Sequence, residues 1–551
     1  MKFCYNSQTF NYEQMKKDLR SAAYGDVFSF EKGVYHVYEE QTDKAYYAVS
    51  NCDAGVKSIA FYLKNQENVT IEGNGSTLML HGRISPFIID GGKKITIKGF
   101  TVDYEKAFYL QGRVVSSTES YLDLALLPQN EYYFDGTTLV QKIGDAEVRF
   151  DENAPSLWQA FDAEKKRVLR DSQCRVVRFS APAPDQTEKE LFFVEEIAPK
   201  TLRIYGKEMQ EFPVGAEIVF YGEKRNANTV FASGVNGLTV TDLEIYHSPS
   251  FGVNCQLCKN VTLTRVSCRL GEARHGLVTA NADATHFIAC TGTVKLDNCY
   301  FENMLDDGTN VHSIFTDVVS VNGKEVRLRL FHHQQQEINV YLPGDTVIFY
   351  RKKSLQPVCR AKILSSRLVA KDCVEIVVKG KLSGVTVGDQ AENYTRQPKF
   401  QMINCTVRNN RPRGALIATR KKAVVKNCYF STSSSGVEVS VENLYWYESG
   451  GVTNLLIKNN VFEDCCHQYG GAAVGVVPSY PYEEGNKHYC RNIRMVNNVV
   501  KTQDKMLLFA KSSKNVLVKN NAHLTLSGEP LCGVETHYTE NCKNVRLIPK
   551  N

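Results

Sequence analysis

The sequence predicts an all-β protein, a right-handed parallel β-helix (a solenoid) with two inserted antiparallel modules that resemble β-barrels. The first observation is a recurring phrase of alternating apolar residues followed by Asn or Asp and then a small or apolar residue, as in NVTIEGN, GLTVTDL, NVTLTRV, VVKNCYF, LLIKNNVF and VLVKNNA. The second is its spacing, which is 23 residues between several neighbouring copies: Leu238 and Val261, Asn404 and Asn427, Asn497 and Asn520. The third is that two long stretches interrupt the phrase and resemble each other.

A repeat of 23 residues limits the architectures that the chain can adopt. It holds two or three short strands with their turns, but it is shorter than the roughly 30 residues that a strand–helix–strand unit needs. Period-two alternation turns Val, Ile and Leu inward, while Asn at the turns tolerates a left-handed backbone and can bond the equivalent Asn of the next coil. Such strands stack about 4.8 Å apart in a parallel solenoid. The L-x-x-L-x-L-x-x-N pattern of leucine-rich repeats is missing.

The two interruptions divide the chain. Both are rich in alternating strands of an antiparallel kind, and PVGAEIVFYGEKR (213–225) parallels LPGDTVIFYRKKS (342–354). We therefore expect two barrel-like modules of common design that wall a binding cleft. An amphipathic helix pattern near the start predicts a cap over the first coil. The expected division is 1–113 (cap and first coils), 114–230 (first module), 231–312 (coils with the acid centre described below), 313–398 (second module) and 399–551 (final coils).

Composition narrows the classes of partner. Of the 551 residues, 43% are hydrophobic and 10% aromatic, as in a folded protein with a large core. The net charge of +6, from 66 basic and 60 acidic residues, is too small to indicate nucleic acid or an anionic membrane, so a neutral or lightly charged ligand is expected. No apolar run approaches the ~18 residues that could span a bilayer. The start lacks the apolar stretch of a signal peptide, so we expect a cytoplasmic protein or an exported one whose leader was removed.

The 17 cysteines sit mostly in strand-like phrases such as VKNCYF and VFEDCC. We interpret them as reduced, buried small hydrophobes. Zinc is not expected, because the close pairs Cys255/Cys258 and Cys465/Cys466 lack a second well-spaced pair of Cys or His.

The most informative stretch carries three aspartates. Asp283 in ANADATHF stands 23 residues before Asp306 in NMLDDGTNVH, so these carboxyls should lie on neighbouring rungs of one face, with Asp307 beside them. Crowded acids cannot all ionise independently, and one protonated carboxyl beside an ionised one is what glycoside cleavage requires. The alternative is that DDG is a turn and NAD an Asn-ladder position. His286 and His312 on the same two rungs favour an acid centre.

Other polar residues are candidates for binding a ligand at these rungs. His312 could orient an acid or bond a sugar hydroxyl, and His275 offers the same choices; a satisfied structural histidine is the alternative for both. The guanidinium groups of Arg413 and Arg420 in RPRGALIATR suit paired hydroxyls or a carboxylate, although such a run is often a solvated turn.

Two further motifs belong to this set. Trp446 beside Glu448 in NLYWYESGG suits a hexose, whose C–H face stacks on an aromatic ring and whose hydroxyls need acceptors. The alternative is a rim aromatic that packs on an inserted module. Asp103 and Gln111 in DYEKAFYLQG stand at the edge of an early coil, where turn capping is the alternative.

With these residues in hand, the chain resembles glycoside hydrolase family 110, the α-1,3-galactosidases that remove terminal galactose from blood-group-B-type and related glycans. The resemblance rests on DYEKAFYLQG, ANADATHF, NMLDDGTNVH, RPRGALIATR and NLYWYESGG in this order, and it covers most of the chain. It implies exo-acting, inverting hydrolysis that needs no metal and no cofactor. Asp306 then looks like the general acid, with Asp283 and Asp307 sharing the activation of water.

Crowding of these acids bears on the stereochemistry. Inversion normally needs about 6.5–9.5 Å between acid and base, whereas rungs stack about 4.8 Å apart, so the carboxyls must splay or the rule bends. A similar trio occurs in the polygalacturonases of family 28, whose N-x-D and DD pattern is matched by Asn281, Asp283, Asp306 and Asp307. Their R-x-K element, which grips uronate carboxylates, has no convincing counterpart, and this favours a neutral galactoside.

Other functions stay open at this stage. They are a polygalacturonase-like hydrolase of an acidic or sulfated polysaccharide, a non-catalytic glycan-binding β-helix, and a polysaccharide lyase, which usually needs a calcium–acid cluster. The expected partner is a glycan with a terminal α-galactose, linear or branched, and the chain is compatible with a homodimer.

Overall fold

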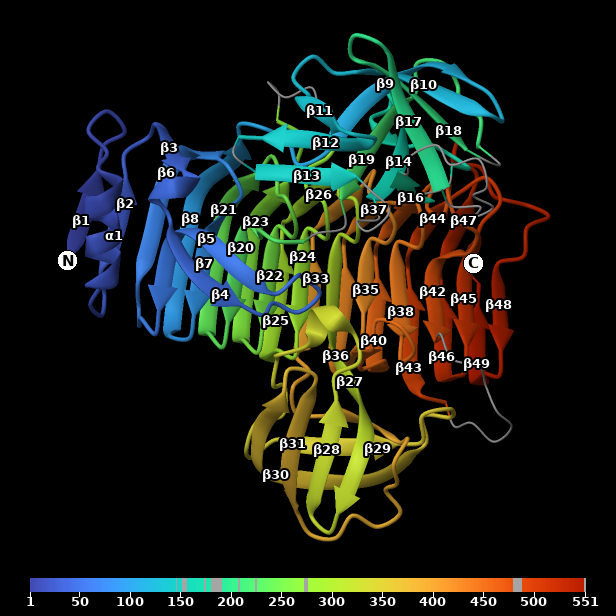
Figure 1. Cartoon of the computed structure of the whole chain (residues 1–551). Helices are drawn as coiled ribbons and strands as arrows, with labels where there is room; N and C mark the ends of the chain where they lie inside the picture. Colours follow the sequence, from blue (N-terminus) through green and yellow to red (C-terminus); the bar gives the residue numbers. More distant parts are fainter. Residues whose placement is uncertain are drawn as a thin grey trace.

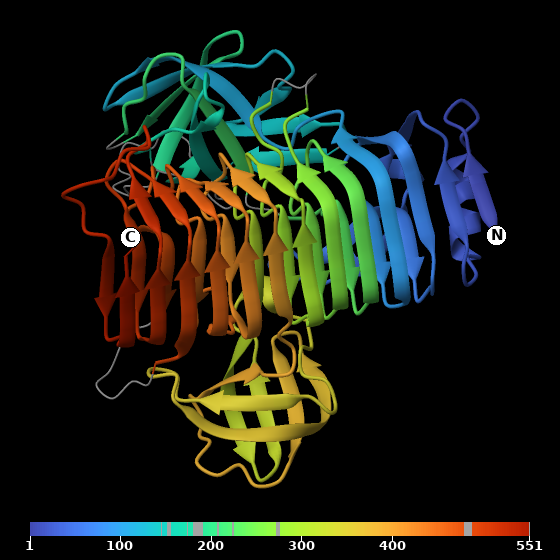
Figure 2. The same ribbon diagram turned by 180° about the vertical axis from the view of Figure 1, so that it is seen from behind.

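The chain winds into a right-handed parallel β-helix, the fold that the repeat predicts, in this computed structural model (Figure 1). Its coils stack in chain order from the N-terminal to the C-terminal end, and the view from behind shows the same stack (Figure 2). The structure describes residues 1–144, 146–150, 156–172, 175–179, 191–206, 209–222, 225–271, 276–478 and 488–549.

One face of the stack carries the aspartates at its strand starts. Its strands pair in parallel with their equivalents on neighbouring coils. In order they are β5 (Gly55–Lys64), β7 (Ile84–Asp90), β20 (Val230–Ser233), β22 (Val253–Gln256), β24 (Thr285–Ile288), β27 (Thr309–Asn322), β35 (Ala415–Ile417), β38 (Val437–Val441), β42 (Ala472–Pro478), β45 (Met506–Lys511) and β48 (His537–Glu540).

The remaining faces are built from long strands in the early coils and from strand pairs in the later ones. The long strands are β6 (Thr70–His81), β8 (Lys93–Tyr104), β21 (Asn236–Ile245) and β23 (Lys259–Cys268). The later ones are β25 (Thr291–Asp297) and β26 (Tyr300–Glu302), β33 (Lys399–Ile403) and β34 (Thr406–Arg408), β36 (Thr419–Lys426) and β37 (Tyr429–Ser431), β40 (Val452–Lys458) and β41 (Val461–Glu463), β43 (Cys490–Val496) and β44 (Val499–Lys501), β46 (Ser513–Lys519) and β47 (Ala522–Leu524), and finally β49 (Lys543–Ile548).

Asparagine forms the turns between these strand pairs, as the sequence predicts. Asn404, Asn427 and Asn497 have φ values of 56°, in the left-handed region that Asn tolerates better than most residues. The Asn427 amide donates to the Asn404 carbonyl oxygen at 3.2 Å, so the side chains form a ladder from coil to coil. The register Leu238 with Val261 confirms the 23-residue period in this part of the stack.

A short cap closes the N-terminal end. It contains β1 (Lys2–Tyr5), α1 (Tyr12–Arg20), β2 (Val27–Phe30) and β3 (Val34–Tyr38), whereas β4 (Asp43–Tyr47) pairs antiparallel with β5 on the face of the stack. Asn11 caps α1, because its side chain accepts the Gln14 N–H at 3.0 Å. Met15 and Leu19 on this helix are buried in the main core. Within the described part of the chain, no helix has the length and apolar character needed to cross a bilayer.

The first inserted module is an antiparallel barrel with one parallel pair. Closure runs through β9 (Leu110–Ser117), β10 (Tyr121–Leu126), β18 (Thr201–Gly206), β17 (Leu191–Ala198), β16 (Arg175–Phe179), β14 (Ser156–Asp162) and β19 (Glu217–Gly222), which pairs again with β9. Beside it lie β15 (Arg167–Val168) and a meander of β11 (Tyr132–Asp135), β12 (Thr138–Ile143) and β13 (Ala146–Phe150).

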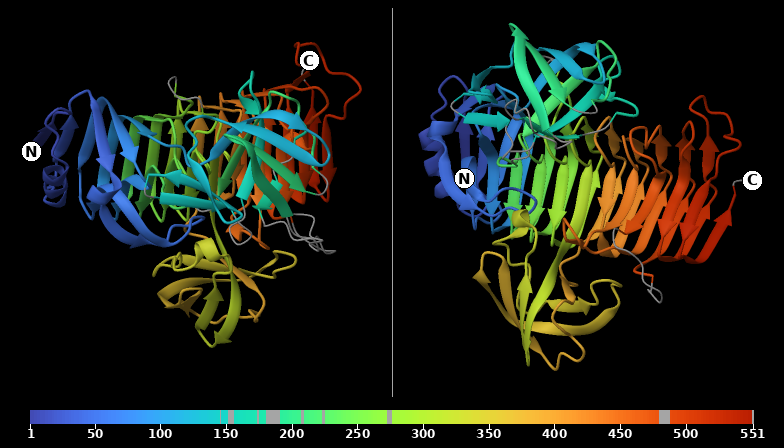
Figure 3. Two further views of the ribbon diagram at one scale, coloured as in Figure 1. Left: turned by 45° about the horizontal axis from the view of Figure 1, so that its top comes forward. Right: turned by 45° about the vertical axis from the view of Figure 1, so that its right-hand side comes forward.

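The second module is a closed antiparallel barrel that grows out of β27. Its other strands are β28 (Glu325–Arg329), β29 (Thr346–Tyr350), β30 (Pro357–Ala370), β31 (Cys373–Lys379) and β32 (Gln390–Asn393). The two modules project from different sides of the stack, the first above and the second below in Figure 1, and two further views agree (Figure 3). Each packs around its own apolar cluster.

The core of the stack is apolar and contains most of the described cysteines. Val, Ile, Leu and Phe side chains from every face fill it, together with cysteines such as Cys255, Cys258 and Cys290. The described cysteines are free thiols, in line with the expectation of reduced residues.

Candidate active site

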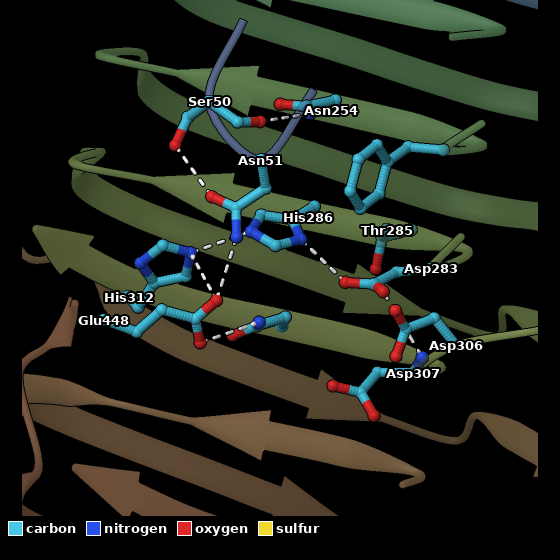
Figure 4. Close-up of polar contacts among 12 residues, drawn as sticks. Ser50, Asn51, Asn254, Asp283, Thr285, His286, Asp306, Asp307, His312 and Glu448 are labelled. Carbon is cyan, nitrogen blue, oxygen red and sulfur yellow. Dashed lines mark hydrogen bonds and ion pairs between the residues drawn. The ribbon is translucent and has the colours of Figure 1, made fainter. Parts of the chain in front are cut away.

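The three aspartates meet at one corner of the stack. Asp283 immediately precedes the β24 rung, and Asp306 and Asp307 precede the β27 rung. One carboxyl oxygen from each of the three lies within 4.8 Å of those of the other two (Figure 4). Parallel pairing between consecutive coils therefore brings acids that are distant in sequence to one point.

The register at this corner differs from the sequence prediction. Thr285 pairs with Thr309, and Ala280 bridges Met304, so the local offset is 24 residues rather than 23. Asp307, not Asp306, is therefore the register partner of Asp283. The Asp307 backbone N–H donates to the Asp283 Oδ1 atom at 3.3 Å. An extra residue before β27 sets this offset, which a period measured on other coils does not reveal.

A cavity of about 320 Å³ lies over the trio. Its walls come from four places: the coils, the first module, the base of the second module, and a loop of the cap region. Representative residues are Asp283, Asp306, Asp307 and Arg413 on the coils, Leu157 and Tyr221 from the first module, His332–Gln334 at η2 (His333–Gln335), Trp446, and Asn51. Its volume is at the small end of the range for ligand pockets.

Asp307 is paired with an arginine of the next coil. Arg413 donates from Nε at 2.8 Å and Nη2 at 2.9 Å to its two oxygens, and the Arg413 backbone N–H adds a third bond at 3.0 Å. Burial, with the charges of Asp306 and Asp283, raises the pKa of the Asp307 carboxyl although Arg413 opposes them, so the hydrogen bonds decide its assignment. We assign the ionised form, because three N–H donors on two carboxyl oxygens are the bonding pattern of a carboxylate.

Asp306 is held by two other arginines. Arg225 donates to Asp306 Oδ2 at 2.7 Å, and Arg411 lies 3.9 Å from Oδ1. Burial works against ionisation of Asp306, but the positive charges of Arg225 and then of Arg411 and Arg413 outweigh it and lower its pKa. Asp306 is therefore ionised in the unliganded site, and its Oδ1 atom is the least engaged carboxyl oxygen of the three.

Asp283 contacts a histidine instead of an arginine. Its Oδ2 atom lies 2.6 Å from His286 Nδ1, and the carboxyl is only 3% exposed. Burial, reinforced by the charge of Asp306, raises its pKa well above the usual range. The three acids thus differ in electrostatic environment, as expected of an acid/base centre.

Behind Asp283 lies a buried cluster of His286, His312 and Glu448 (Figure 4). The two histidine Nε2 atoms are 2.8 Å apart, and His312 Nδ1 lies 2.7 Å from the Ser313 carbonyl oxygen. Both oxygens of Glu448 accept amide N–H groups, from Asn51 at 3.0 Å and Asn310 at 3.2 Å. Burial lowers the pKa of both histidines to about 4.

Two groups of described residues could offer metal ligands, the aspartate trio and this cluster. In the cluster, two nitrogens bound tetrahedrally to one zinc ion would lie about 3.3 Å apart at the usual bond length, further than the observed 2.8 Å. Its polar atoms already bond one another, and each aspartate has its own cationic or histidine partner. The nitrogen and oxygen atoms that could act as metal ligands therefore already have hydrogen-bond or ion-pair partners in the protein.

Several predicted binding residues do line the cavity. Asn281 lines it and donates its amide to the Phe108 carbonyl at 2.8 Å. Trp446 lies against the Arg225 guanidinium, whose carbon is 5.8 Å from a Trp446 ring centroid, and against His332 at 4.5 Å between ring centroids. His286, Arg413 and Glu448 line the cavity too, whereas His312 is fully buried behind His286.

Three predicted residues lie elsewhere. Arg420 forms a buried ion pair with Glu392 at 3.1 Å and stacks on Tyr489, which ties the second module to the coils. Gln111 is buried at the base of the first module, where it bonds Glu217 and accepts the Leu277 N–H at 3.0 Å. Asp103 lines a separate cavity beside His36 and His81. His275 lies outside the described residues.

The structure adds residues that sequence reasoning missed. Arg225 ends the first module, and its guanidinium reaches Asp306 while its backbone N–H bonds Asp53 at 2.8 Å. Arg225 is the last residue of the segment PVGAEIVFYGEKR, which resembles a segment of the second module. That resemblance predicted a shared module design but no role at the site. Asn51 and His332 come from loops with no repeat signal, so no sequence spacing could have placed them here.

The fold and the site together define a class: a parallel β-helix glycoside hydrolase with an acid centre at a coil corner. Residues 325–390 match the family model of GLAA-B β-barrel domain II, which is the second module here. The α-1,3-galactosidase A of Shewanella woodyi is 30% identical over 494 residues, which cover 87% of this chain and 78% of that protein. The chain belongs to the α-1,3-galactosidase family, glycoside hydrolase family 110, as its motifs indicated.

Two other relatives are also named α-1,3-galactosidases. The α-1,3-galactosidase B of Bacteroides thetaiotaomicron is 26% identical, covering 91% of this chain and 82% of its own. The α-1,3-galactosidase A of Bacteroides fragilis is 27% identical, with 94% and 85% covered. Among solved structures, the A-module of the Azotobacter vinelandii mannuronan C-5 epimerase AlgE6 aligns over 99% of both chains with a TM-score of 0.40 and 11% identity.

Proposed function

We propose that this glycoside hydrolase removes terminal α-1,3-linked galactose from blood-group-B-type or linear galactosides, by inverting carboxylate acid/base catalysis. The observation that carries the proposal is the convergence of three aspartates with different electrostatic surroundings on the floor of one small cavity. Both modules wall the cavity, and its volume is at the small end of the range for ligand pockets. Both features favour binding of the end of a glycan chain over binding of the middle of a polymer.

Polar atoms in the cavity suit a neutral sugar. Asn281 and Asn310 line the cavity, and neutral amide side chains of this kind suit the hydroxyl groups of an uncharged sugar. The three arginines of the cavity, Arg225, Arg411 and Arg413, face the carboxylates of Asp306 and Asp307, and Glu442 and Glu448 also line the cavity. A uronate or sulfate would therefore find no excess positive charge, which favours a galactoside over an acidic polymer.

The bonding of the acids supports inversion even though they are crowded. A retaining enzyme needs a carboxylate oxygen free to attack the sugar. Both oxygens of Asp307 are bound by Arg413, and those of Asp283 face His286 and the Asp307 N–H. Water activated by Asp283 and Asp307 is the better nucleophile, while the least engaged oxygen, on Asp306, meets the glycosidic oxygen as the acid.

The first test is Asp306→Asn, assayed for galactose release from an α-1,3-linked galactoside. We expect a loss of about 10³-fold or more with unchanged folding, because the amide cannot exchange a proton. Asp242→Asn, at an exposed acid of β21, is the matched control and should keep full activity.

The stereochemistry and the substrate class are checked with the native enzyme. Proton NMR during the first turnovers should show β-galactose before mutarotation. Hydrolysis of a galacturonan but not of any α-galactoside would instead assign the polygalacturonase-like function. Wild-type activity in Asp306→Asn would show that Asp306 is not the general acid.

A further inference from the structure

The buried hydrogen bonds behind Asp283 determine where protons can sit. The Ser313 carbonyl oxygen can only accept, so His312 Nδ1, 2.7 Å away, must carry a hydrogen. His312 is fully buried, and the nearest oxygen of Glu448 is 3.6 Å from its Nε2 atom, beyond hydrogen-bond length. His312 is therefore neutral, with a bare Nε2.

This tautomer propagates to the next two groups. A bare His312 Nε2 accepts, so His286 Nε2, 2.8 Å away, must donate. His286 is also neutral and buried, which leaves its Nδ1 atom as an acceptor. The atom opposite that nitrogen is Asp283 Oδ2 at 2.6 Å, and it can only form this bond by carrying a hydrogen (Figure 4).

The other oxygen of Asp283 fits the same assignment. Oδ1 accepts the Asp307 backbone N–H at 3.3 Å, as the carbonyl oxygen of a neutral carboxylic acid would. One hydroxyl that donates and one carbonyl oxygen that accepts complete its bonding. Each of the other two aspartates accepts N–H bonds from an arginine side chain, at 2.7 Å for Asp306 and at 2.8 and 2.9 Å for Asp307.

We infer that Asp283 is the carboxyl that stores the catalytic proton in the unliganded enzyme, and that His286 and His312 are positioning residues that hold it there. The inference rests on the proposed function for its catalytic meaning. The charged groups around Asp283 are consistent with it: Asp306, Asp307 and Glu448 disfavour a further negative charge, whereas Arg225 and Arg413 are occupied by Asp306 and Asp307.

A stored proton on Asp283 closes the catalytic cycle. When substrate displaces Arg225 from Asp306, the O–H bond of Asp283 breaks as an O–H bond forms on Asp306, with no change in net charge. Asp306 then gives this proton to the glycosidic oxygen, and the attacking water gives one proton to the Asp283 carboxylate. The products are two hydroxyl groups, and both aspartates return to their starting forms without a separate proton from solvent.

The proton positions can be read in the unmodified protein. With ¹⁵N-labelled histidine, NMR at neutral pH should show His286 neutral with its hydrogen on Nε2 and His312 neutral with its hydrogen on Nδ1. Infrared difference spectra should show a protonated carboxyl band that Asp283→Asn removes. An imidazolium at either position, the opposite tautomers, or one bound equivalent of zinc would overturn the inference.

Substitutions at His312 test the positioning role. In His312→Leu, His286 can turn to its Nδ1–H form and donate to an ionised Asp283, which lowers the pKa of that carboxyl. The alkaline limb of kcat/KM should then move to lower pH by about 1 unit or more, and kcat at neutral pH should fall roughly 10–100-fold with KM within about threefold. His312→Gln, whose amide can donate to Ser313 and accept from His286, should restore most of the activity and the pH profile.

The control for loss of a buried histidine is His467→Leu, which lies away from the cavity and bonds backbone carbonyls. It should change stability but not the pH profile. If His312→Leu and His312→Gln both keep the wild-type alkaline limb, the positioning role is wrong. Because the NMR and infrared results need no substrate, they stand or fall separately from the choice of galactosides.

Discussion

The acid corner and the final coils have the same stacked geometry but different chemistry. In the final coils an inner column of Asn460, Asn498 and Asn521 satisfies itself: Asn498 Oδ1 accepts the Asn460 N–H at 2.9 Å, and its amide donates to the Ile457 carbonyl at 3.1 Å. An amide can both donate and accept, so a column of them closes without outside help.

A column of carboxyls cannot close in this way. Ionised Asp306 and Asp307 only accept, so the acid corner draws in arginines from the first module and from the next coil, and a histidine chain from behind. The solenoid supplies a row of aligned side chains. The residue type decides whether that row holds the coils together or holds unbalanced charge that a reaction can use.

Arg413→Ala should have the largest effect, because it removes the partner of a buried carboxylate at the acid corner. It leaves Asp307, which is 1% exposed, as a buried charge without its partner, which costs about 3–5 kcal/mol of unfolding free energy. Galactose release should fall roughly 10³-fold because Asp307 loses the cation that holds its carboxylate in place. Urea unfolding and steady-state kinetics measure both effects.

The matched control is Arg408→Ala, whose half-exposed side chain lies 3.6 Å from Glu302 on the same stack. An exposed pair of this kind contributes at most about 1 kcal/mol, and activity should be unchanged. Equal stability of the two variants would mean that Asp307 does not depend on Arg413 for its charge.

Asn498→Asp makes the inner ladder resemble the acid corner without its arginines. The new carboxyl would face the Ile457 carbonyl and the Asn521 Oδ1 atom, which accept from the amide now. We expect a loss of about 2–3 kcal/mol of unfolding free energy at neutral pH. Because burial raises the folded-state pKa of such a group, the loss should shrink as pH falls toward 4.

Thermal unfolding at two pH values checks this. Asn497→Asp, at the exposed neighbouring position with a φ of 56°, should change stability by less than about 0.5 kcal/mol, since Asp also tolerates that backbone. A loss at Asn498→Asp that does not depend on pH would argue against the electrostatic explanation.

Asn427→Ala addresses the outer, exposed ladder and should have the smallest effect. It removes one bond to Asn404 and places Ala at a φ of 56°, for about 0.5–1 kcal/mol. Asn427→Gly should cost less, because glycine has no steric penalty there. If both variants lose the same amount, the hydrogen bond matters more than the backbone conformation.

Much of the site was within reach of the sequence, with instructive exceptions. Asp283, Asp306, Asp307 and His286 were found because they lie in or beside coil strands whose spacing can be counted. Arg413 was found because its guanidinium suits paired hydroxyls or a carboxylate. The 23-residue spacing predicted that Asp306 is the register partner of Asp283. The structure shows an offset of 24 residues at β27, so the partner is Asp307. Arg420 is the second residue of β36, but its side chain forms an ion pair with Glu392 of the second module.

The sequence alone determined the β-helix, its period, its asparagine ladders, its two modules and the convergence of Asp283, Asp306 and Asp307 at one corner. These follow from local alternation and regular spacing, which a solenoid converts directly into neighbours. Only the tertiary structure decided that Arg225 and the His286–His312 pair meet those acids, and so which carboxyl can hold a proton. Such contacts join segments of no fixed spacing, and charge in a buried site depends on every group that reaches it.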